Sequence, residues 1–163
     1  MRILGFFIAL VFLLSFQTRA DDFPIRLNLT KSNGNTLYVG ALLANKVAAS
    51  FMIDTGSSVV VLNQKTLDEL KAAGGTIVKT SQMGARLANG RIRMVQRYQI
   101  ETLSLGEDCA FRNVEVAVMK NSNNILGMSL LTTTAPFAIF SQPAQLGLSQ
   151  CGSSQLHIAA VEH

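Results

Sequence analysis

Apolar and polar residues alternate with a period of two through most of this chain. The alternation covers residues 25–29, 37–43 and 47–53, with Asn45 and Lys46 marking a turn between the last two. It returns from residue 77 to 105 and from 114 to 118, and residues 136–140 have the composition of an edge strand. Because side chains alternate between two faces only in a β-strand, we expect an all-β domain, closed into a barrel or sandwiched.

One helix interrupts the strands. Asn63 can cap it, Leu67 and Leu70 lie one turn apart, and Gly74–Gly75 can end it. Before it, residues 59–62 are three β-branched valines followed by a leucine, an apolar run typical of a strand buried on both faces. We therefore expect a single short helix against one side of the sheet.

Two irregularities are expected in the long strand region. Asn89–Gly90 predicts a tight hairpin turn of the primed type, with Gly84 as a competing turn position. The apolar parity changes from even positions at Ile100 to odd positions at Leu103, so a bulge or corner is expected near Glu101–Thr102.

The N-terminus has the pattern of a secretory signal peptide. Arg2 precedes a largely apolar stretch, residues 3–16, and small residues at Thr18 and Ala20 fit a cleavage site. The apolar stretch is shorter than the ~20 residues of a membrane-spanning helix. We expect residues 1–20 to be removed and the protein to be exported, periplasmic or secreted, with an uncleaved N-terminal anchor as the alternative.

The remaining 143 of the 163 residues suffice for one domain. Two of the fourteen basic residues, Arg2 and Arg19, lie in the leader, so twelve basic residues face ten acidic ones. Four arginines cluster without interleaved aromatic residues, so a solvated strand face is expected and nucleic-acid binding is not; they are Arg86, Arg91, Arg93 and Arg97.

The chain has two cysteines, Cys109 and Cys151. In an exported domain a disulfide is the simplest interpretation, and it would tie the last segment to the middle of the chain. A zinc site would have to recruit His157 or His163, and no ligand spacing supports one. We expect no metal and no cofactor.

The stretch FMIDTGSSVVVL, residues 51–62, places Asp54 where a buried strand ends. An unpaired buried carboxylate costs several kcal/mol, but Thr55, Ser57 and neighbouring N–H groups can donate hydrogen bonds to it. Gly56 lets the backbone approach closely. The simplest alternative is a loop whose acid bonds only its own backbone.

The flanks of this loop resemble the active-site loop of aspartic proteases. The stretch NILGMSLL, residues 124–131, is similar to the hydrophobic-hydrophobic-glycine element of that family, and Ala88–Asn89–Gly90 falls where such proteins place the flap hairpin. The order and spacing resemble the single-lobe, retropepsin-like branch found in bacterial exported proteins. The resemblance implies a closed, barrel-like retropepsin fold for residues 21–143.

This resemblance implies an aspartic endopeptidase acting on peptides. Aspartic proteolysis needs two carboxylates, and the chain carries the Asp-Thr-Gly motif once, so a homodimer would place Asp54 of each subunit on a two-fold axis. Supporting roles are implied for Thr55, Gly56, Ser57 and Gly127. The flap would include residues Leu87, Ala88, Asn89 and Gly90.

Two stretches depart from the family pattern. Residues 144–163 form an additional C-terminal extension, tied to the domain if Cys151 is in a disulfide. The segment 129–134 is rich in threonine, which favours strand or loop over the helix that family members place after the glycine element. The alternative function is a non-catalytic peptide-binding or assembly module that keeps the fold.

Overall fold

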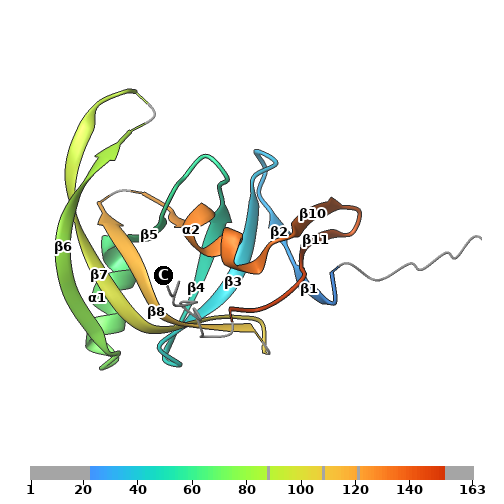
Figure 1. Cartoon of the computed structure of the whole chain (residues 1–163), viewed down its shortest axis with the longest axis horizontal. Helices are drawn as coiled ribbons and strands as arrows, with labels where there is room; N and C mark the ends of the chain where they lie inside the picture. Colours follow the sequence, from blue (N-terminus) through green and yellow to red (C-terminus); the bar gives the residue numbers. More distant parts are fainter. Residues whose placement is uncertain (1–22, 88, 108, 121, 153–163) are drawn as a thin grey trace, which may run out of the picture.

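The computed structural model describes residues 23–87, 89–107, 109–120 and 122–152. The first 22 residues, which include the expected signal peptide, lie outside this range. Six strands form a closed barrel, because the sheet order β3-β4-β9-β5-β8-β7 is completed by pairing of β7 with β3 (Figure 1). The barrel strands are β3 (Leu37–Leu43), β4 (Val47–Ile53), β5 (Val60–Asn63), β7 (Ile92–Leu105), β8 (Cys109–Met119) and β9 (Asn124–Leu126). The expected all-β, closed barrel-like fold with one short helix is confirmed.

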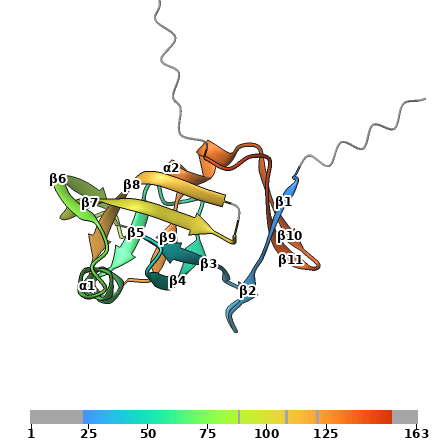
Figure 2. The same cartoon turned by 90° about the horizontal axis from the view of Figure 1, so that it is seen from below.

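A smaller three-stranded sheet stands beside the barrel, away from the β6–β7 side (Figures 1 and 2). Its order is β1 (Ile25–Asn28), β11 (Ala144–Leu148) and β10 (Phe137–Ser141), so β10 is an edge strand as expected. Residues 144–148, which were expected to belong to a C-terminal extension, thus form the central strand of this sheet. Leu146 and Leu148 of β11 are fully buried in the hydrophobic core. A two-residue strand, β2 (Thr30–Lys31), pairs antiparallel with β3.

The parity change predicted in the long strand marks a corner, at which β7 changes its pairing partner from β6 to β3. Up to Ile100 the strand pairs with β6 (Ile77–Arg86), and from Leu103 it pairs with β3. Thr102 and Leu103 are both buried, so the buried side of the strand switches there. The register irregularity itself lies in β6, between Lys79 and Gln82. This corner closes the barrel.

The predicted helix is α1 (Gln64–Ala72). The Asn63 side chain caps it by accepting a hydrogen bond from Thr66 N at 2.7 Å, and Gly74 ends it with φ +69°. Leu67 and Leu70 are buried against the sheet. Both end signals read from the sequence are confirmed.

The expectation of strand or loop at 129–134 is wrong. Residues Met128–Leu131 form helix α2, and Thr132–Thr134 continue as a 3₁₀-helix, η1. Each threonine hydroxyl of η1 donates to a backbone carbonyl three or four residues back, as Thr134 does to Leu131 O at 2.8 Å. These local hydrogen bonds offset the low helix propensity of threonine.

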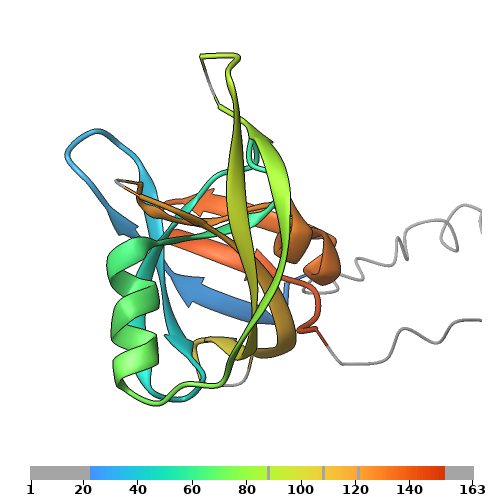
Figure 3. The same cartoon turned by 90° about the vertical axis from the view of Figure 1, so that its left-hand side faces the viewer.

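Strands β6 and β7 form a long hairpin that projects beyond the barrel (Figure 3). Leu87 N donates to Arg91 O, and Gly90, with φ +79°, donates to Leu87 O, both at 2.8 Å. The closing pair therefore encloses three residues, which corrects the expected two-residue primed turn. Gly84 pairs with Met94 inside the ladder and is not the turn.

The core joins both sheets and α1. Among its fully buried side chains are Phe51, Leu62, Leu70, Leu126 and Leu146. A disulfide between Cys109 and Cys151 has a Cα–Cα distance of 5.1 Å and ties the segment after β11 to the start of β8. Among the described helices, none has the length and apolar character to cross a membrane.

We predict that replacing both cysteines, Cys109→Ala with Cys151→Ala, lowers the free energy of unfolding by about 3 to 4 kcal/mol. The reason is that the crosslink removes the loop-closure entropy of the 42-residue separation from the unfolded chain. Urea unfolding of the variant and of the oxidised protein measures the difference. Reduced wild-type protein is the control and should match the variant; a loss below about 1 kcal/mol contradicts the prediction.

Candidate active site

Asp54 begins the loop that joins β4 to β5. Its backbone N–H donates to Leu126 O at 3.2 Å, which extends the pairing of β4 with β9 by one residue. The Gly56 N–H donates to the Asp54 carboxylate at 2.8 Å, and Ser57 N donates to Asp54 O at 3.2 Å. The carboxylate is half-buried and accepts this one hydrogen bond from the described part of the chain. The backbone therefore fixes the acid and leaves it accessible from outside the barrel.

The Asp54 loop is held by the segment that follows β9. A Cβ on Gly127 would overlap the carbonyl oxygen of Val59 and lie 2.8 Å from that of Ser57. At the start of α2, Met128 N donates to Ser57 O at 2.8 Å, and Ser129 N donates to Ser58 O at 3.1 Å. Only glycine permits this approach, so residue 127 and the two N–H groups after it set the position of the loop.

A buried amide, which sequence reasoning missed, locks the base of the same region. Asn124 is 6% exposed, and its side-chain oxygen accepts from Asn63 N at 2.9 Å. Its side-chain nitrogen donates to Ser50 O at 3.3 Å and to Thr66 Oγ1 at 3.1 Å. One side chain thus joins β4, β9, the end of β5 and α1. The available signal was a polar residue directly before the apolar pair of a buried strand.

The other loop residues lie as follows. Thr55 and Gly56 are exposed, and a Cβ on Gly56 would approach Asp54 Oδ1 to 3.1 Å. The Ser57 hydroxyl donates to Val59 O at 2.8 Å and not to the Asp54 carboxylate, to which the loop sequence would allow it to donate. In the single chain, Ser57 therefore stabilises the loop and not the acid.

The expected flap residues Leu87, Asn89 and Gly90 lie at the tip of the β6–β7 hairpin, and Ala88 lies outside the described residues. The hairpin tip and the β4–β5 loop project toward the same end of the molecule (Figures 1 and 3). Asn89 accepts a hydrogen bond from Arg91 N at 3.1 Å, which supports the turn.

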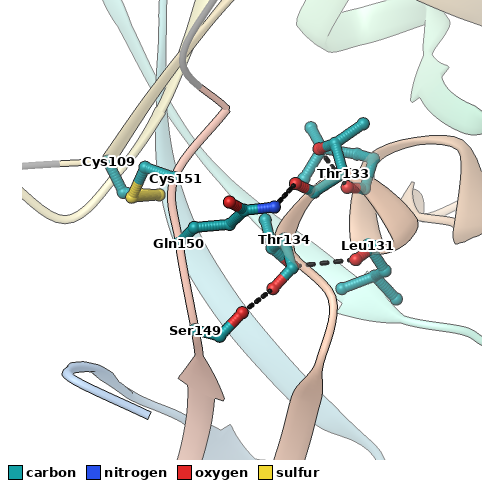
Figure 4. Close-up of a disulfide and its surroundings, with 8 residues drawn as sticks. Cys109, Leu131, Thr133, Thr134, Ser149, Gln150 and Cys151 are labelled. Atoms are coloured by element: carbon teal, nitrogen blue, oxygen red, sulfur yellow. Dashed lines mark hydrogen bonds between the residues drawn. A yellow bond between two sulfur atoms is a disulfide. The ribbon is translucent and has the colours of Figure 1, made fainter. Parts of the chain in front are cut away.

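The C-terminal segment is fastened to the helix that supports the loop (Figure 4). Ser149 Oγ donates to Thr134 O at 2.9 Å, and Gln150 Nε2 donates to Thr133 O at 3.2 Å. Next to them Cys151 forms its disulfide with Cys109. The disulfide thereby holds η1, and with it α2, in place.

The described residues contain no group of three or more His, Cys, Asp or Glu side chains that could hold a metal ion. His157 and His163 lie outside the described residues.

Comparisons with known proteins agree with this arrangement. A family model described as "gag-polyprotein putative aspartyl protease" matches residues 41–133, a range that includes Asp54 and Gly127. A crystal structure of a retropepsin-like aspartic protease from Rickettsia conorii has a similar fold, with a TM-score of 0.55 and 23% identity. The match covers 76% of this chain and 88% of that one. No curated protein matches this chain.

We predict that Gly127→Ala destabilises the protein by about 3 kcal/mol, because the added methyl group meets backbone carbonyls that cannot move aside without shifting the loop. Gly40→Ala is the matched control, since a Cβ there meets nothing within 4 Å. Thermal and urea unfolding of both variants measure the effect. Equal stability of the two variants would contradict the close packing at Gly127.

Proposed function

The chain belongs to the gag-polyprotein aspartyl protease family, and on that premise we propose that it is an aspartic endopeptidase that acts as a homodimer. The observation that carries the proposal is Asp54 itself. It lies at the end of a buried strand, in a loop held by Gly127 and α2. Its carboxylate is half-buried and accepts one hydrogen bond from the described residues. This is a fixed acid that is free to meet a second group.

In this proposal the second carboxylate comes from another copy of the chain. The sequence holds the Asp-Thr-Gly motif once, and the catalysis needs two carboxylates around one water. In a two-fold homodimer the two Asp54 loops face each other across the axis. Thr55 and Gly56, both exposed, are then available to the partner's loop.

Two neighbouring carboxylates share one proton, because both cannot ionise at close range. The charged Asp54 acts as general base and removes a proton from the bound water, while the protonated Asp54 donates a hydrogen bond to the scissile carbonyl. The water oxygen attacks the carbonyl carbon and forms a tetrahedral intermediate. The C–N bond then breaks as a proton passes to the leaving amine.

The substrate in this proposal is an extended peptide. The β6–β7 hairpin closes over it with Leu87, Asn89 and Gly90 at its tip, and main-chain hydrogen bonds supply much of the binding. We also propose an exported, periplasmic or secreted location. The Cys109–Cys151 disulfide supports it, because disulfides persist in oxidising compartments.

Substitution of the acid tests the proposal. Asp54→Asn should lower cleavage of denatured casein by about 10²-fold or more, because the amide cannot act as a base. Asp68→Asn, which changes an exposed acid on α1, is the matched control and should cleave like the wild type. Cleavage is measured from acidic to neutral pH, with the oligomeric state determined by analytical ultracentrifugation in the same buffer.

Two results contradict the proposal: a dimeric wild type that cuts nothing, or an Asp54→Asn variant that cuts as well as the wild type. In the first case, retained binding of unfolded casein would identify the chain as a peptide-binding module of this fold.

A further inference from the structure

The positive charge of this protein is concentrated in one hairpin. Residues 77–100 contain five basic residues and no acidic ones: Lys79, Arg86, Arg91, Arg93 and Arg97. Outside this stretch, residues 23–152 carry seven basic residues and seven acidic ones. The net positive charge of residues 23–152 therefore comes from the hairpin, and the rest of that range is balanced in charge.

Three of these arginines have no acidic partner in the described part of the chain. Arg97, near the base of the hairpin, pairs with Glu115 at 2.9 Å and also bonds Ser81. Arg86, Arg91 and Arg93 are exposed and form no ion pair with described residues. Arg97 has a structural role, whereas the side chains of the three distal arginines form no ion pair or hydrogen bond with the described residues.

The distal part of the hairpin is a separate two-stranded arm. Pairing of β7 with β8 ends at Gln96 and Val118, while pairing of β7 with β6 continues to Ile92 and Arg86. The arm therefore leaves the barrel and projects toward the end of the molecule that holds the Asp54 loop (Figure 3). Among the described strands, none pairs with the outer edge of either strand of the arm.

Positive charge is present on both faces of the arm and at its tip. Arg86 pairs directly with Ile92, so the two share a face, while Arg93 lies on the other face, opposite Ala85. Arg91 closes the turn. On the face of Arg86, Ile92 is 66% exposed and Met94 is 62% exposed, and no side chain at Gly84 covers them. A partner meeting this face encounters apolar side chains next to a guanidinium.

We propose that this arm makes the protein selective for extended peptides that carry Asp or Glu residues beside the apolar residues flanking the cleaved bond. The inference rests on the proposed protease function and adds a substrate class to it. Arginine and carboxylate form charge-assisted hydrogen bonds, and the uncompensated charge raises the local concentration of acidic peptides. In a dimer two such arms meet one substrate.

A nucleic acid is the competing polyanion, and the hairpin fits it less well. Stacking platforms need exposed aromatic side chains. The hairpin contains one aromatic residue, Tyr98, whose ring packs against the core and has the Lys71 ammonium 5.2 Å from its centre.

The test starts from the full-length chain and a peptide library prepared from a digested bacterial lysate. Mass spectrometry of the products should show Asp and Glu enriched within a few residues of the cleaved bonds. One cleaved peptide is then synthesised together with its Asn/Gln counterpart. The ratio of kcat/KM for the acidic over the neutral peptide should exceed one and should decrease as salt is added.

The variant Arg86→Gln/Arg91→Gln/Arg93→Gln should lower this ratio by about fivefold, mainly through KM, and should abolish its salt dependence. The matched control removes three exposed basic residues elsewhere, Lys46→Gln/Lys65→Gln/Arg112→Gln, and should keep the wild-type ratio. Circular dichroism confirms that both variants are folded.

The preference for acidic peptides is also measured by binding, without catalysis. Asp54→Asn protein is titrated with a short fluorescent peptide that alternates Glu with Val, and with its Gln counterpart. Tighter binding of the Glu peptide supports the proposal if the difference disappears when the three arginines are replaced. This holds even if the wild type cleaves nothing, because that result would contradict only the protease function.

Three results overturn the selectivity: cleaved bonds without acidic neighbours, an equal loss in the control variant, or no difference between the two binding peptides. Arginine-dependent binding of a single-stranded DNA oligomer with none of the Glu peptide would also overturn it.

Discussion

The contact between Gly127 and the carbonyl groups of Ser57 and Val59 is the constraint on which the candidate site depends. It brings the start of α2 close enough for two N–H groups to bond the Asp54 loop. Without a side chain at residue 127, β9 can pass directly beneath the loop and pair with both β4 and β5. The closed barrel and the placement of the acid therefore follow from the same close approach.

Much of this arrangement was predictable from local signals. Period-two alternation identified the strands, Asn63 and Gly74 bounded α1, and the parity change after Ile100 marked the corner of β7. The Asp-Thr-Gly loop and the glycine after Leu126 were recognisable because each needs particular residue types at fixed positions. Most secondary-structure features set by neighbouring residues were read correctly for this reason, whereas the turn at Asn89–Gly90 has three residues inside its closing pair instead of the expected two.

Features set by distant partners were not. The threonines at 132–134 disfavour a helix by propensity, but their hydroxyls bond nearby carbonyls. In addition, the carbonyls of Thr134 and Thr133 accept hydrogen bonds from Ser149 and Gln150, which lie 15 and 17 residues further along the chain. The role of Asn124 depends on donors and acceptors from three other elements. Likewise, residues 144–148 were separated from the domain because no local signal shows that β11 lies between β1 and β10.

The pairing of β1 with β11 has a consequence for how the chain folds. Ile25 lies opposite Leu148, so β1 pairs with a strand 123 residues further along the chain. Closing so long a loop is slow compared with forming the local hairpins. The small sheet is therefore expected to form late in folding, and until then β1 presents an open strand edge to other chains.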